Sequence, residues 1–165
     1  MRSETISQWL PWALLAAAAA ALGTAYTAQL GSGYEPCVLC LYQRVPYAII
    51  AALGVLAIFV TPLAHRRLIT ALAGLVFAVG AGIALYHVGV EQTWWTSAAP
   101  CGASGSAVSN TEDFLAALQK KPEKSCGDID WTLFGISMAT YNAVISALLA
   151  VLSFLAWRQL TKPKT

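Results

Sequence analysis

Charged side chains are scarce in this sequence. Aspartate, glutamate, lysine and arginine make up only 11% of its 165 residues, whereas an ordinary soluble domain carries about 25%. Hydrophobic residues make up 58%, so a water-soluble fold could hardly cover its surface. No basic patch with interleaved aromatic residues is present, which argues against nucleic acid as a partner. The composition therefore favours a lipid bilayer as the solvent.

The sequence also lacks the motifs of common redox cofactors and of a structural zinc site. It contains no flavin, haem or nucleotide motif. Its single CxxC, Cys37 and Cys40, has no second pair of the kind that a four-thiolate zinc site usually shows. There are four cysteines in all. Four cysteines allow three pairings, and spacing alone does not choose among them.

Four long apolar stretches occupy most of the chain, over residues 9–30, 41–60, 68–90 and 133–157. Each is close to the roughly 20 residues that a helix needs to cross a hydrocarbon core of about 30 Å. The first is longer than the roughly 7–15 apolar residues of a signal peptide, so we expect an uncleaved helix. The pattern predicts an all-α membrane protein, with residues 1–165 forming one domain and a four-transmembrane-helix bundle.

Basic residues predict the orientation of the bundle. The two termini and the loop between the second and third stretches share one side of a four-pass protein. They carry Arg2, Arg66, Arg67, Arg158, Lys162 and Lys164. The positive-inside rule makes this side cytoplasmic. The loops 31–40 and 91–132, which hold the cysteines, then lie outside in an oxidising compartment. Within the longer loop, residues 111–121 could form a short amphipathic helix on the membrane surface or a plain solvated helix.

Three interpretations of the cysteines compete: structural disulfides, a zinc site and a redox relay. A disulfide between Cys101 and Cys126 would close a long loop and could contribute about 3–4 kcal/mol of stability. The loop between Cys37 and Cys40 is too short for much entropic stabilisation, whereas CxxC pairs tend to have a lowered thiol pKa. The spacing therefore favours a redox role and leaves the other two open.

Charged and titratable residues lie at the same depth as the CxxC. Arg44 follows Cys40 by four residues, where a helix places both on one face. It could snorkel to water, or it could stabilise a Cys40 thiolate or an anionic ligand. His87 and Glu91 have the same spacing and could form an interfacial ion pair or a proton relay beside a redox cofactor. Because Pro46 cannot donate a backbone hydrogen bond, we expect the second helix to begin near Arg44 or to kink there.

These segments resemble a known family. Cys37-Val38-Leu39-Cys40-Leu41-Tyr42-Gln43-Arg44 resembles the first outer loop of the DsbB disulfide-bond oxidoreductases. Tyr86-His87-Val88-Gly89-Val90-Glu91 resembles the end of that family's third helix. Cys126, followed by Trp131, Phe134-Gly135 and Met138, resembles its run into the fourth helix. The resemblance spans nearly the whole chain, with the long loop least alike. Glu91 departs from the enterobacterial members, which have glutamine there.

The resemblance implies a disulfide oxidoreductase of the bacterial inner membrane, with both termini cytoplasmic and the cysteines periplasmic. A reduced periplasmic thioredoxin-fold protein of the DsbA type would attack the Cys101–Cys126 disulfide at Cys101. Released Cys126 would attack Cys37, and Cys40 would leave as a thiolate. Each step is the attack of a thiolate on a disulfide sulfur.

The resemblance also implies that a membrane quinone takes up the electrons. Arg44, His87 and Glu91 would bind it where their helices end. We expect ubiquinone rather than menaquinone, and no metal. One alternative is a quinone-linked relative that oxidises a dedicated partner. Another, from a different class, is a non-enzymatic four-helix membrane protein stapled by two structural disulfides. Cysteines that a partner protein can reduce would favour the enzyme, and inert cysteines would favour the staple.

Overall fold

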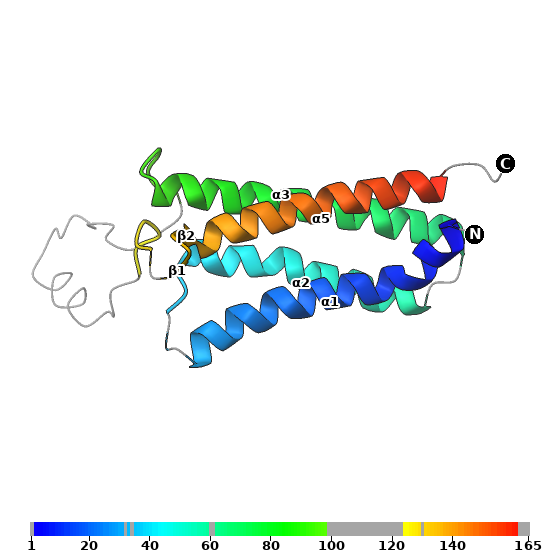
Figure 1. Cartoon of the computed structure of the whole chain (residues 1–165), viewed down its shortest axis with the longest axis horizontal. Coiled ribbons are helices and arrows are strands. Elements are labelled where there is room, and N and C mark those ends of the chain that lie inside the picture. Colours follow the sequence, from blue (N-terminus) through cyan, green and yellow to red (C-terminus); the bar gives the residue numbers. More distant parts are fainter. Residues whose placement is uncertain are drawn as a thin grey trace, which may run out of the picture.

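Four long helices run beside one another and form an elongated bundle (Figure 1). The structure is a computed structural model that describes residues 2–31, 33, 35–59, 62–98, 124–129 and 131–161. Its long helices are α1 (Arg2–Gly31), α2 (Val38–Phe59), α3 (Leu63–Glu91) and α5 (Met138–Thr161). Each is long and apolar enough to cross a membrane. The prediction of a four-transmembrane-helix bundle is confirmed.

The helix α2 begins before the position that its proline suggests. It starts at Val38, so Cys40 and Arg44 are both helical and Pro46 lies inside the helix. Of the two alternatives, a start near Arg44 is therefore wrong, and a kink there stays a prediction. Proline removes one helical hydrogen bond, but its ring fits against α3, where a Cβ placed at Gly80 would lie 3.3 Å from the Cβ of Pro46. The close approach of two helices at a glycine accommodates the proline.

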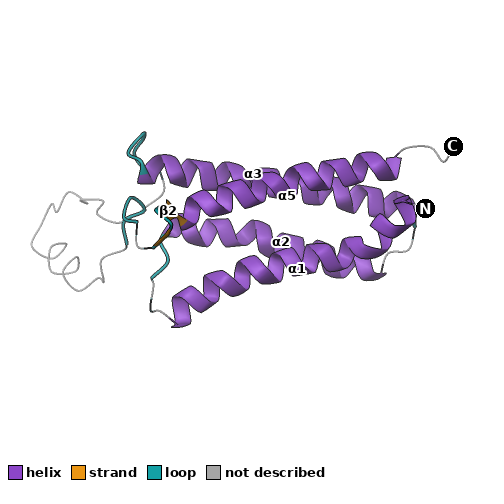
Figure 2. Ribbon diagram, viewed as in Figure 1, coloured by secondary structure: helices purple, strands orange, loops and turns teal. Residues whose placement is uncertain are grey.

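The helix α5 begins later than predicted, at Met138 rather than residue 133. Two short strands, β1 (Thr132–Leu133) and β2 (Ile136–Ser137), form an antiparallel pair ahead of it (Figure 2). Their turn contains Phe134 and Gly135, with φ angles of 52° and 77°. This left-handed backbone cannot continue a right-handed helix. The apolar sequence therefore enters the bundle as a turn before it becomes helical.

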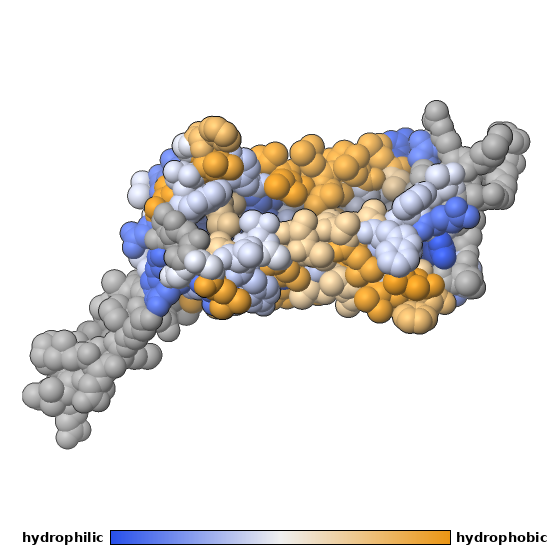
Figure 3. All heavy atoms as spheres, turned by 60° about the horizontal axis from the view of Figure 1, so that its bottom comes forward, coloured by the Kyte–Doolittle hydropathy of each residue, from blue (hydrophilic) through white to orange (hydrophobic). Residues whose placement is uncertain are grey.

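The core of the bundle consists of apolar side chains from all four helices. Its buried members are Leu10, Leu14, Ala18, Tyr47, Ile50, Ala57, Ile69, Ala73, Phe77 and Ala150. Many larger apolar side chains point outward instead. Figure 3 shows hydrophobic residues over the middle of one face, with hydrophilic residues towards both ends. Such a surface suits lipid, which satisfies apolar side chains as well as a protein core does.

The two ends of the bundle carry different features. The start of α1, the end of α2, the start of α3 and the end of α5 lie together at one end (Figure 1). The CxxC, the end of α3 and the strands lie at the other. The expected surface helix at residues 111–121 and the residue Cys101 fall outside the described residues. That residues 1–165 form one domain stays a prediction.

Candidate redox site

The two cysteines of the CxxC lie at the N-terminal end of α2. Cys37 immediately precedes the helix and is 6% exposed, and Cys40 lies in the first turn. Both are free, and their Sγ atoms are 2.9 Å apart. A disulfide bond measures about 2.05 Å, so a small side-chain movement would bring the two sulfur atoms to bonding distance. The start of α2 is thus a dithiol arranged for oxidation.

Several hydrogen-bond donors converge on the sulfur of Cys37. The backbone N–H of Cys40 lies 3.3 Å from it, and Nε2 of His87 lies 3.6 Å away. When Cys37 is deprotonated, the Cys40 thiol also donates to it. Together with His87, and against the opposing effect of burial, this bond lowers the pKa of Cys37 to about 4. The sequence suggested a thiolate at Cys40, but these donors favour Cys37 in the reduced pair.

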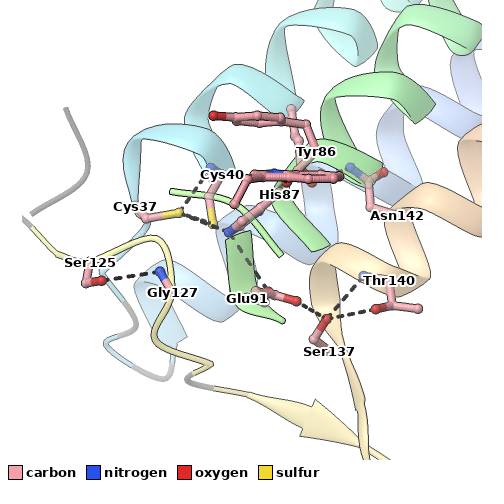
Figure 4. A network of polar contacts seen from close by, with 12 residues as sticks. Cys37, Cys40, Tyr86, His87, Glu91, Ser125, Gly127, Ser137, Thr140 and Asn142 are labelled. Atoms are coloured by element: carbon pink, nitrogen blue, oxygen red, sulfur yellow. Dashed lines mark hydrogen bonds and ion pairs between the residues drawn. The ribbon is translucent and has the colours of Figure 1, made fainter. Parts of the chain in front are cut away.

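His87 and Glu91 connect the CxxC to the start of α5. Nε2 of His87, a buried residue, lies 3.9 Å from Oε1 of Glu91. The Ser137 hydroxyl donates to Oε2 of Glu91 at 2.5 Å, and it accepts the backbone N–H of Thr140 at 3.2 Å as the N-cap of α5. Figure 4 shows these contacts in line from Cys37 to Ser137. Glu91 therefore holds the end of α3 against α5 beside the imidazole.

Arg44 points towards α1. Its Nη1 donates to Oε1 of Gln29 at 2.8 Å, and the guanidinium carbon lies 4.8 Å from the centre of the Tyr26 ring. Such a hydrogen bond and cation–π contact fix the planar group in place. The four-residue spacing from Cys40 predicted a shared helix face, but the contacts of the guanidinium come from α1.

A cavity of about 590 Å³ brings five of the predicted site residues together. Both CxxC cysteines line it, and so do Arg44, His87 and Glu91. The rest of its wall is mainly apolar and includes Ala17, Ala20, Ala21, Leu22, Ala25 and Ala28 of α1 with Ile145 and Leu149 of α5. Small-molecule sites typically combine apolar walls with a few polar groups. The cavity can therefore hold an apolar molecule that has a polar end near the cysteines.

Cys126 lies against the CxxC. It is 1% exposed and disulfide-bonded, and it belongs to a small buried cluster with Cys37, Leu39 and Val90. A cysteine of the long loop is thus close to the cysteine that it would attack in a relay. Because Cys101 is outside the described residues, its pairing with Cys126 stays a prediction.

Comparison with known proteins identifies the family. The model of the family "Disulfide bond formation protein DsbB" matches residues 7–156. This chain belongs to the DsbB family. A protein named Disulfide bond formation protein B from Xanthomonas campestris pv. campestris (strain 8004) is 35% identical over 134 residues, which cover 78% of this chain and 77% of that protein. One of the same name from Xylella fastidiosa (strain 9a5c) is 33% identical over 133 residues, covering 77% and 76%. No solved structure matches significantly.

As a DsbB family member with four membrane-spanning helices, this protein is a multi-pass membrane disulfide oxidoreductase. The alternative of two structural disulfides fits the geometry poorly, because Cys37 and Cys40 are free. Their short loop would also add little stability if it were closed. The arrangement of donors around Cys37 is what thiol–disulfide exchange requires, since the thiolate is the reactive species.

The sequence interpretation missed a set of polar residues beside His87. Gln43 is 8% exposed, and its Nε2 donates to Nδ1 of His87 at 2.7 Å. Asn142 donates to Oε1 of Gln43 at 2.5 Å, and the Tyr47 hydroxyl donates to Oδ1 of Asn142 at 2.7 Å. One signal was available, because polar side chains within a membrane-spanning stretch are costly and usually functional.

Proposed function

We propose that this DsbB family member reoxidises a periplasmic DsbA-type thiol oxidase and passes the electrons to a membrane quinone. The observation that carries the proposal is the apolar cavity of about 590 Å³, which reaches the CxxC and is also lined by Arg44. A quinone is a flat, lipid-soluble ring with carbonyl oxygens at its edge. The apolar wall suits the ring, and the guanidinium of Arg44 offers donors to an oxygen.

The relay begins with the partner protein. Its thiolate attacks Cys101 and breaks the proposed Cys101–Cys126 disulfide, and Cys126 leaves as a thiolate. Cys126 then attacks Cys37 of the oxidised CxxC, and Cys40 leaves. Each attack forms one disulfide bond and breaks another. The cluster of Cys126 with Cys37 supports this order, because the attacking and accepting sulfur atoms belong to neighbouring residues.

The relay is completed when the partner's second thiol attacks its own cysteine in the mixed disulfide. Cys101 is released and attacks Cys126, which restores their disulfide and leaves Cys37 and Cys40 reduced. A bound quinone would accept the two electrons that are released when the Cys37–Cys40 disulfide re-forms. Arg44 would hold the quinone by hydrogen bonds, while His87 would hold or transfer a proton beside it. Glu91, next to His87, would keep the imidazole in place.

We further propose that the CxxC end faces the periplasm of the bacterial inner membrane, and that both termini are cytoplasmic. Arg66, near the start of α3, and Arg158, in the last turn of α5, lie towards the end of the bundle where α1 begins and α5 ends (Figure 1). The positive-inside rule supports a cytoplasmic position for that end. Reporter fusions at Thr165 and within 102–109 should report opposite sides, and reporters on the same side would disprove the topology.

The deciding experiment is quinone reduction by the purified full-length protein, supplied with a reduced DsbA-type partner. Partner oxidation and quinone reduction should proceed in equal amounts, and Cys40→Ser should abolish both. Ubiquinone and menaquinone supplied in parallel would test our expectation of ubiquinone. In Cys126→Ser, a mixed disulfide between Cys101 and the partner should accumulate on non-reducing gels. Failure of the unaltered protein to reduce either quinone would disprove the quinone-linked function.

A further inference from the structure

A chain of polar side chains crosses the apolar bundle and ends at the CxxC. Its members are Gln43 and Tyr47 of α2, Asn142 and Ser146 of α5, and His87 of α3. All except Asn142 are at most 8% exposed. Buried polar groups are costly unless they are satisfied, and satisfied networks fix the orientation of their members. The relay of thiols described above makes no use of this chain apart from His87.

The hydrogen bonds give the chain a direction. The hydroxyls of Tyr47 and Ser146 both donate to Oδ1 of Asn142, at 2.7 and 3.2 Å. Asn142 turns its Nδ2 towards Gln43 and donates to Oε1 at 2.5 Å. Since Oε1 of Gln43 is the accepting end of that amide, Nε2 is the end that faces His87. It lies 2.7 Å from Nδ1.

This direction determines which ring nitrogen of His87 carries the hydrogen. A neutral imidazole has one N–H and one accepting nitrogen, and Nδ1 accepts the bond from Gln43. The hydrogen is then at Nε2, which lies 3.6 Å from Sγ of Cys37 and 3.9 Å from Oε1 of Glu91. The neutral ring can therefore donate towards the Cys37 thiolate. In the other tautomer a lone pair would face that thiolate and repel it.

We propose that Gln43 and Asn142 are positioning residues, which fix the Nε2–H tautomer of His87 and thereby favour the thiolate of reduced Cys37. The proposal deepens the proposed function, in whose cycle the reduced CxxC occurs. Donors that are oriented in advance stabilise a charge without reorganising when it forms. The amides act through His87, and neither is placed in contact with the sulfur.

The same tautomer bears on metal binding. The ligand atoms of Cys37, Cys40 and His87 lie within 4.8 Å of one another, a spacing that would also suit a soft metal ion. A histidine that binds a metal through Nε2 normally donates its other N–H to an acceptor. Here Nδ1 faces the donor group of Gln43. The hydrogen bond from Gln43 to Nδ1 thus favours donation from Nε2 of His87 to the sulfur of Cys37 over metal ligation by that nitrogen.

The test is the pH dependence of Cys37 alkylation in the full-length protein, with its cysteines reduced and the Cys37 adduct identified by peptide mass. Gln43→Leu removes the amide at similar size and should raise the apparent pKa of Cys37 by about one pH unit, which is a tenfold decrease in its acid dissociation constant. Asn142→Leu should shift it in the same direction by less, because Gln43 remains but loses the partner that orients it.

Other charged or titratable groups line the same cavity and are left unaltered in these variants. They are Glu35, Cys40, Arg44, Tyr47, His87, Glu91, Lys124, Asp128 and Tyr141. Ser153→Ala is the matched control, since Ser153 is a polar residue of α5 that is 9% exposed and outside the chain of contacts. Its Cys37 titration should equal that of the unaltered protein.

A second measurement reads the tautomer directly. The protein has two histidines, so imidazole ¹⁵N spectra assigned with His65→Gln should place the hydrogen of neutral His87 at Nε2 in the unaltered protein. Gln43→Leu should lose this preference. A hydrogen at Nδ1 in the unaltered protein would overturn the proposal, as would an unchanged Cys37 titration in folded Gln43→Leu and Asn142→Leu. If Gln43→Leu does not fold, Asn142→Leu decides. Neither measurement contains quinone or partner, so failure of quinone reduction would leave this inference standing.

Discussion

Replacement of Arg44 by alanine should weaken quinone binding and leave the bundle folded. The guanidinium lines the cavity, where Gln29 accepts its hydrogen bond at 2.8 Å and the Tyr26 ring lies 4.8 Å away. Both contacts come from the last turns of α1, so they hold the guanidinium in a fixed orientation beside the CxxC. Alanine would remove the charge and every donor that this side chain could offer to a quinone oxygen.

The expected size of the effect follows from these contacts. A hydrogen bond to a charged group contributes about 1.5–3 kcal/mol, so Arg44→Ala should weaken the apparent quinone affinity about tenfold or more, at least about 1.4 kcal/mol. Arg44→Lys should recover only part of the loss, because lysine keeps the charge but not the planar fork. Gln29→Ala removes one of the two orienting contacts and should cost about threefold, or about 0.7 kcal/mol.

The assay is steady-state turnover against quinone concentration at saturating reduced partner. Arg158→Ala is the matched control, because Arg158 lies in the last turn of α5, at the other end of the bundle, and its loss should not change the apparent KM for quinone. An unchanged KM in Arg44→Ala would refute the role in binding. Arg44 would then be an interfacial residue whose charge is accommodated by α1.

Reduced Cys37 should stay reactive in weak acid: its pKa is lowered to about 4, so the thiolate is lost only as the pH falls through that value. Alkylation that still accelerates above neutral pH would contradict this. Gly89→Ala should displace Trp95, whose ring would lie 2.0 Å from the added Cβ; unchanged tryptophan emission would argue against the packing. Ser137→Ala removes the cap of α5 and a bond to Glu91, and should lower the free energy of unfolding by about 1–2 kcal/mol in thermal denaturation. Ser137→Thr should restore most of it.

The sequence alone indicates the membrane bundle and five of the residues that line its cavity, which are Cys37, Cys40, Arg44, His87 and Glu91. Lipid offers no hydrogen bonds, so each apolar stretch long enough to cross it must form a helix that satisfies its own backbone. The four-residue spacing also gave a correct prediction of neighbouring side chains, because residues four apart share a helix face. It placed His87 beside Glu91, and Nε2 of His87 lies 3.9 Å from Oε1 of Glu91. These features depend on interactions within a single segment of the sequence, so they can be predicted without knowing how the segments pack.

The rotation of each helix about its axis, and so the face that it turns to its neighbours, follows from the packing of the bundle and not from the apolar stretches. Gln43 and Asn142, which are 99 residues apart, meet because α2 and α5 present those faces to each other. Helices in lipid associate through shape and polar contacts, so apolar composition does not specify which face is inward. For the same reason, the sequence did not predict that the side chain of Arg44 points towards α1. The start of α5 was hidden because hydropathy does not distinguish an apolar turn at Phe134 from an apolar helix, whereas backbone geometry does.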